Sequence, residues 1–344
     1  MTLIRSRISP RGTPIFLLAV LLCSIVGINA SPALGPYQTE VATTMLVYLA
    51  IAEAWNILAG FGGAISLGVT GFVGTGAYAT GLLELHDGLG WLAALVLGTL
   101  VGGALAVILA FPLLRLRGDY FAIGTLAASL GLQAWLLNWR FAGGSTGLNI
   151  PVQSTPDEAV LYRVAVVVAT VAIMVAIIVK RSRFGLRLMA VRDDEGAAAA
   201  LGVSTFRHRL AAFVISSVLI SLAGGLVALQ QGTFEPTGLL NISWTINALL
   251  MTIVGGIGTV TGPAVGAVVV YYLLTKQFET HATFGLIIEG TLLIIIVRYA
   301  PQGLWPTLTR TIRRRPRFGR RPERTVDPSI LAGKIEASSR TVPS

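Results

Sequence analysis

Residues 90–114 read GWLAALVLGTLVGGALAVILAFPLL, a run of 25 residues without one charged side chain. A hydrocarbon layer about 30 Å thick needs roughly 20 mostly apolar helical residues to cross it. This run therefore predicts a membrane-spanning helix. The whole chain of 344 residues has the same character, because 54% of its residues are hydrophobic and 12% are charged, against about 25% charged in soluble domains.

Other apolar runs along the chain have the length and composition of membrane spans. Together they predict an all-α, polytopic transmembrane helical bundle of about ten spans. The expected spans are residues 14–30, 41–59, 67–84, 90–114, 120–139, 160–179, 208–229, 241–256, 262–276 and 284–300.

The basic residues predict the orientation of these spans. With the N-terminus inside, 23 of the 26 Lys and Arg residues fall on the cytoplasmic side, and ten of those follow Pro306. Such a bias follows the positive-inside rule and places both termini in the cytoplasm. The net charge of +10 is thereby explained without nucleic acid. We expect a cytoplasmic N-terminus (1–13), a transmembrane domain (14–305), and a basic, disordered cytoplasmic tail (306–344) near lipid headgroups.

Glycine is concentrated in two segments, GFGGAISLGVTGFVGTGAYATG (60–81) and VGGIGTVTGPAVGA (254–267). Small residues let helices approach closely in lipid, and irregular backbone is tolerated where it lines a cavity. The segments are therefore expected either to flank a translocation path or to serve helix packing alone. The glycines at packing spacing are Gly98, Gly102, Gly258, Gly262 and Gly266.

One sizeable cytoplasmic loop, residues 180–209, separates two spans. Its composition from Arg187 to Leu201 predicts one short helix closed by Gly202, with Arg192 and Glu195 close enough to pair. Such a slim helix fits a groove on another protein, although a solvated interfacial helix has the same pattern. The chain has no GxxxxGK[ST] phosphate-binding motif, so nucleotide chemistry would belong to a partner.

No constellation of residues in the sequence indicates catalysis. Ser/His/Asp, Cys/His and metal-ligand patterns are missing, and the single cysteine, Cys23, excludes an intramolecular disulfide. We therefore expect neither an enzyme nor a metal site.

Several blocks, in order, resemble the permeases of branched-chain amino acid importers of the LivM type. They are WNILAGFGGAISLG (55–68), LRLRGDYFAIGTLA (114–127), GGSTGL (143–148), the Ala-rich residues 184–202, VGGIGTVTGPAVGA (254–267) and APQGLW (300–305). Relatives of this family also serve urea and amides, so the carried solute stays open among these.

The resemblance implies a heteromeric ABC transporter in the bacterial plasma membrane. A second, LivH-like permease, two ATPase subunits that bind ATP and Mg²⁺, and an extracytoplasmic solute-binding protein would complete it, and this chain would hold no cofactor. The implied ATPase-coupling loop contains Gly185, Ala190, Arg192, Glu195, Ala198 and Gly202.

Polar residues within the expected spans are the remaining candidates for function. Glu53 and Glu289 are intramembrane acids, each either functional or neutralised by local contacts. They also fit an alternative, an ion-gradient-driven secondary transporter, and a non-transporting scaffold is a third possibility. Hydroxyl groups that could line a path for a zwitterionic solute, or bond back to their own helices, are on Ser66, Thr70, Thr75, Tyr78, Thr125 and Thr252.

Overall fold

The computed structural model describes residues 12–30, 35–151, 153 and 155–272, with the isolated positions 291, 294 and 298. Nearly all of this part of the chain is helical. The long helices are α1 (Gly12–Ala30), α2 (Pro36–Asn56), α3 (Val69–Asp87), α4 (Trp91–Leu113), α5 (Asp119–Asn138), α6 (Glu158–Arg181) and α9 (Thr205–Gln231). The shorter helices are α7 (Arg183–Asp193), α8 (Glu195–Ala200), α10 (Pro236–Leu239), α11 (Ser243–Gly255) and α12 (Thr261–Val270).

The expectation of an all-α membrane bundle is confirmed in its coarse form. Within the described ranges, six helical segments are long and apolar enough to cross a membrane, and two shorter apolar helices accompany them. The first nine expected spans each overlap a helix. The tenth, 284–300, and the tail, 306–344, lie outside the described residues.

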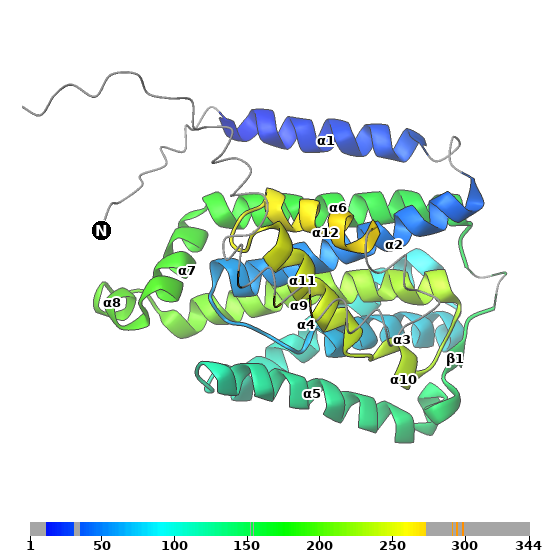
Figure 1. Cartoon of the computed structure of the whole chain (residues 1–344). Coiled ribbons are helices and arrows are strands. Elements are labelled where there is room, and N and C mark those ends of the chain that lie inside the picture. Colours follow the sequence, from blue (N-terminus) through cyan, green and yellow to red (C-terminus); the bar gives the residue numbers. More distant parts are fainter. Residues whose placement is uncertain are drawn as a thin grey trace, which may run out of the picture. The chain divides into compact units, whose positions relative to one another are not determined.

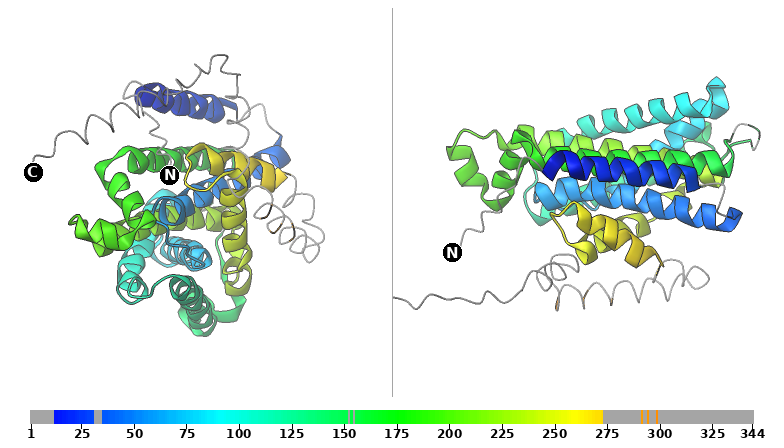
Figure 2. Two further views of the ribbon diagram at one scale, coloured as in Figure 1. Left: turned by 60° about the vertical axis from the view of Figure 1, so that its left-hand side comes forward. Right: turned by 90° about the horizontal axis from the view of Figure 1, so that it is seen from above.

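Helix α9 forms the middle of the bundle and packs against α2, α3 and α4 (Figure 1). Helix α1 lies along α6 at the outside of the bundle (Figure 2), where the Ser24 and Thr170 hydroxyls are 2.6 Å apart. Helices α7 and α8 lie at one end of the bundle, and β1 and α10 lie toward the other (Figure 1).

Small residues bring α3, α4 and α9 together. A side chain at Gly98 would collide with Thr80 of α3, and one at Gly102 would collide with Ser221 of α9. A side chain at Gly224 would collide with the Val73 carbonyl of α3. The hydrophobic effect does not drive helices together within lipid. The close approach at these glycines therefore supplies the dispersion contacts that hold α3, α4 and α9 together.

The GGSTGL segment ends in a short strand that the sequence did not predict. Strand β1 (Leu148–Asn149) pairs antiparallel with β2 (Thr233–Phe234). Gly147, at φ 73°, has no room for a side chain beside the Phe234 carbonyl. This contact fixes the loop between α5 and α6 to the end of α9.

Candidate functional site

The 180–209 loop forms two helices where one was expected from 187 to 201. Asp194 is extended (φ −157°, ψ 109°), and its side chain accepts a hydrogen bond from Ala197 N–H at 2.9 Å. Ser182 caps α7 in the same way through Gly185 N–H at 3.0 Å. The expectation of a single helix was wrong because an aspartate can favour an N-cap over continued helix. Gly202 adopts φ 80° directly after α8, a conformation that suits glycine.

Removal of the Asp194 cap should loosen α8 selectively. Asp194→Ala is expected to destabilise this short helix by about 1 kcal/mol, because one first-turn N–H loses its acceptor. Faster hydrogen exchange at amides 195–200 would report the change. Asp194→Asn keeps a capping oxygen and is the matched control; equal exchange in both variants would contradict the capping role.

The expected pair of Arg192 with Glu195 does not form. Arg192 Nη2 instead lies 2.8 Å from Asp193 Oδ1, and Glu195 pairs with Arg209 of α9 at 3.1 Å. The extended backbone at Asp194 separates the two residues from one helical register, so the spacing of three no longer places them side by side. Glu195 thus ties α8 to the start of α9.

One face of α7 is buried against the bundle. Leu188 and Val191 are buried, and Gly185 lies so close to the Val179 carbonyl of α6 that a side chain would not fit. Ala190 points to the exposed side of the helix. These contacts fix the position of α7 relative to the end of α6.

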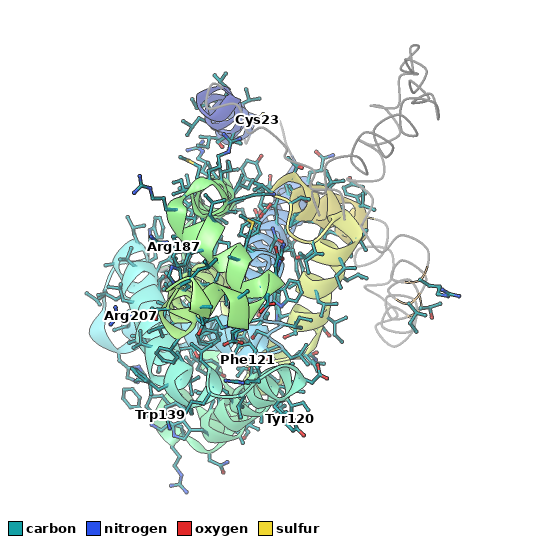
Figure 3. All side chains as sticks on the ribbon, turned by 90° about the vertical axis from the view of Figure 1, so that its left-hand side faces the viewer. Cys23, Tyr120, Phe121, Trp139, Arg187 and Arg207 are labelled. Atoms are coloured by element: carbon teal, nitrogen blue, oxygen red, sulfur yellow. The ribbon has the colours of Figure 1, made fainter. Side chains whose placement is uncertain are left out.

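The exposed surface at this end carries both apolar and charged side chains. Leu186 is 58% and Leu201 is 84% exposed, whereas Ala198 is buried. Figure 3 looks onto this end of the molecule, where the labelled Arg187 and Arg207 lie at the surface. Single exposed apolar residues are common on protein surfaces, so Leu201 by itself does not identify a partner surface.

Two helices of the bundle break close to α7. Helix α2 continues as a π-helical turn, η2 (Ile57–Phe61), and residues 62–68 are not helical before α3 begins. Helices α11 and α12 are likewise separated by residues 256–260. We call these two segments, 57–68 and 256–260, the helix breaks.

Asn56 joins the two helix breaks directly. Its Nδ2 donates to the Thr259 carbonyl at 2.7 Å, and its Oδ1 accepts from Gly258 N–H at 2.8 Å. A side chain at Gly60 would collide with the Asn56 amide. Asn56 was not among the residues expected from the sequence, although an amide inside an apolar run, four residues before GFGG, is a usable signal for such a contact.

The six expected path residues do not gather at one site. Ser66, Thr125 and Thr252 lie around the helix breaks and bond to backbone: Thr125 Oγ1 accepts from Leu67 N–H at 2.9 Å, and Thr252 Oγ1 donates to the Ala52 carbonyl at 3.1 Å. The Ser66 carbonyl accepts from Trp55 Nε1 at 2.8 Å. The Ser66 hydroxyl accepts from Gly68 N–H at 3.2 Å. The hydroxyls of Ser66 and Thr125 thus bond to the backbone of the first break, whereas that of Thr252 joins α11 to α2.

Thr75 and Tyr78 border a cavity of about 410 Å³ between α3, α4 and α5. Its other walls are apolar or aromatic and include Trp135, Trp139 and Phe141. The Tyr78 hydroxyl has no hydrogen-bond partner among the described residues, and Thr75 bonds back to the Gly71 carbonyl at 2.7 Å. Thr70 is buried and is not part of this cavity lining.

Glu53 is fully buried in α2, and neither carboxylate oxygen has a hydrogen-bond partner among the described residues. The charged side chain that acts on it electrostatically is Lys180. A charged carboxylate at membrane depth costs on the order of 3 kcal/mol. The positive charge of Lys180 therefore matters for whether Glu53 is charged. Glu289 lies outside the described residues.

One glycine of the second series, Gly258, differs from its expected helix-packing role. Gly262 and Gly266 are in α12, and a side chain at Gly266 would collide with the Met251 carbonyl of α11. Gly258 is in the helix break at φ 75°, not on a helix face. The GxxxG spacing was misleading at Gly258 because the backbone before Thr261 leaves the helix.

The chain is similar to known transport permeases over most of its length. Residues 37–297 match the family described as branched-chain amino acid transport system / permease component. The high-affinity branched-chain amino acid transport system permease protein LivM of Salmonella typhimurium is 31% identical over 301 residues, which cover 78% of this chain and 70% of that protein. The protein of the same name from Escherichia coli is 30% identical over 325 residues, which cover 85% and 75%.

The similarity extends more weakly to a second kind of permease. The probable branched-chain amino acid transport permease protein LivH of Methanocaldococcus jannaschii is 25% identical over 167 residues, 45% of this chain and 52% of that protein. No solved structure matches the chain.

Proposed function

The chain belongs to the family of branched-chain amino acid transport permeases, and from this premise we propose that it is the membrane-spanning permease subunit of an ATP-driven importer. The observation that carries the proposal is the match over residues 37–297, which includes the α7–α8 region and both helix breaks. The relatives give no support to an ion-gradient-driven transporter. Branched-chain amino acids are the first solutes to test, followed by urea and amides.

In the proposed assembly, this chain works with a second permease, two ATPase subunits and a solute-binding protein, all at a lipid membrane. A second, LivH-like permease forms the translocation path together with this chain. Two ATPase subunits bind ATP and Mg²⁺ and dock on α7 and α8, and an extracytoplasmic binding protein delivers the solute. In this proposal the chain crosses the bacterial plasma membrane about ten times, with both termini in the cytoplasm.

Reconstitution tests this function directly. The chain, a LivH-like permease, two P-loop ATPases and a binding protein encoded nearby are placed in proteoliposomes with radiolabelled leucine, isoleucine or valine, then urea. Uptake is expected only with ATP and the binding protein present. Uptake by this chain alone under an ion gradient, without ATP, would overturn the proposal.

The exposed Leu201 offers a test of the docking surface. Leu201→Glu should weaken association with the ATPase subunits about 10-fold or more, because a charge would be desolvated in an apolar contact. Leu201→Met keeps the apolar surface and is the control. Co-purification at increasing salt measures the effect, and equal retention of the ATPases by both variants would place the docking surface elsewhere.

A further inference from the structure

Two cations hold the backbone of the two helix breaks. Arg192, near the end of α7, donates from Nη1 to the Gly60 carbonyl at 2.8 Å. Lys180, in the last turn of α6, donates from Nζ to the Gly258 carbonyl at 2.7 Å and lies 5.5 Å from the centre of the Phe61 ring. The first break is therefore bonded to a residue of α7 and the second to a residue of α6.

The chemistry of these contacts follows from the breaks themselves. The last carbonyls of a helix lack intrahelical partners and carry the negative end of the helix dipole. A guanidinium or ammonium group is a strong donor to such oxygens. Gly60 is in the final turn of η2, so its carbonyl is at a helix end, whereas Gly258 is three residues past the end of α11 and its carbonyl belongs to the non-helical break.

Arg192 is closely packed against both helix breaks. Gly63 has φ 71°, and a side chain there would lie 3.1 Å from Arg192 Cβ and 3.3 Å from its Cα. At Gly258 an added Cβ would be 3.5 Å from Arg192 Nη1 and 3.3 Å from the Gly60 carbonyl. The first break thus contacts the stem of Arg192, and the second contacts its guanidinium group.

The orientation of Arg192 is set by a second contact. Its Nε and Nη2 both donate to Asp193 Oδ1, at 2.9 and 2.8 Å, which directs Nη1 to Gly60. A lysine at this position has one donor group and cannot make this fork. The Arg192 side chain is 36% exposed, yet its Nη1 atom points into the bundle toward the Gly60 carbonyl.

We propose that Arg192 and Lys180 are positioning residues that carry a displacement of α7 into both helix breaks. The proposal rests on the proposed function. Arg192 accordingly acts on the membrane-embedded part of the chain and is not an ATPase-docking residue. The breaks end α2 and α11 and precede α3 and α12, so moving the Gly60 and Gly258 backbone changes how these four helices meet.

The test uses the complete reconstituted complex and compares Arg192→Met with wild type. We measure ATPase association, ATP hydrolysis and solute moved per ATP. Association and hydrolysis are expected to stay within about twofold, while solute moved per ATP falls about 10-fold, the size of an ordinary coupling free energy. Lys180→Met should lower the same ratio. Arg163→Met, at an exposed arginine near the start of α6 and away from α7, is the control and should match wild type.

Distinct results would overturn the proposal. Wild-type solute per ATP in Arg192→Met would show that no displacement passes through this side chain. Loss of ATPase association from a folded Arg192→Met subunit would make Arg192 a docking residue. If Arg192→Met does not fold, Arg192→Lys decides by the same ratio, and a wild-type value there overturns the proposal. A wild-type complex without ATP-dependent uptake would instead contradict the proposed function.

Discussion

Asn56→Leu is expected to abolish uptake and to lower the free energy of unfolding by about 2–4 kcal/mol. Leucine has a similar size, so packing within α2 is largely kept. What is lost is the pair of hydrogen bonds that Asn56 makes to Gly258 N–H and the Thr259 carbonyl. Both groups would then be left without these partners, and an unsatisfied polar group in this environment is costly.

The control for Asn56 is Asn138→Leu. The Asn138 amide is exposed and donates to the Ala134 carbonyl of its own helix at 2.8 Å, so its loss disturbs no contact between helices. Thermal unfolding of the subunit in nanodiscs and uptake by the reconstituted complex are measured for both variants. Equal unfolding temperatures and equal uptake would show that the helix breaks do not depend on Asn56.

Gly266→Leu should prevent the α11–α12 pair from forming, at a cost of about 3 kcal/mol or more. Any side chain at this position meets the Met251 carbonyl, and the Gly255 nitrogen is 2.9 Å away. Backbone atoms of a packed helix cannot rotate away as a flexible side chain can, so the two helices must separate. Separation would also pull on the 256–260 break that Asn56 and Lys180 hold.

Val268→Leu is the matched control for Gly266, because Val268 is in the same helix and 44% exposed. The measurement is the yield of monodisperse protein after extraction and its unfolding temperature. A Gly266→Leu protein with the yield and unfolding temperature of the control would mean that α11 and α12 do not pack closely in the membrane.

Asn56 and Gly266 belong to the same packed region, which contains the two helix breaks and the helices on either side. Helix α7 contacts the 57–68 break, and that break contacts the 256–260 break through Asn56. A partner that moves α7 would therefore act on two pairs of helices at once. Through these contacts, a movement of α7 at the end of the bundle would reach both helix breaks.

The sequence by itself determined the class of the protein. Apolar runs of about 20 residues without charge admit few structures other than membrane helices, and nine of the ten expected spans overlap helices in the described part of the chain. The ordered blocks around 55–68, 184–202 and 254–267 pointed to the family to which the chain belongs. These signals are local, because each is a continuous stretch of the chain.

Tertiary structure alone decided which polar residues meet. Asn56 and Gly258 are 202 positions apart, and Arg192 and Gly60 are 132 apart, so no spacing along the chain could pair them. The local rule for a pair three residues apart failed at Arg192 and Glu195, because Asp194 leaves the helix to cap the next one. The physical reason is that freed backbone groups take whichever donors and acceptors the packed helices bring within reach, and only the folded bundle fixes that choice.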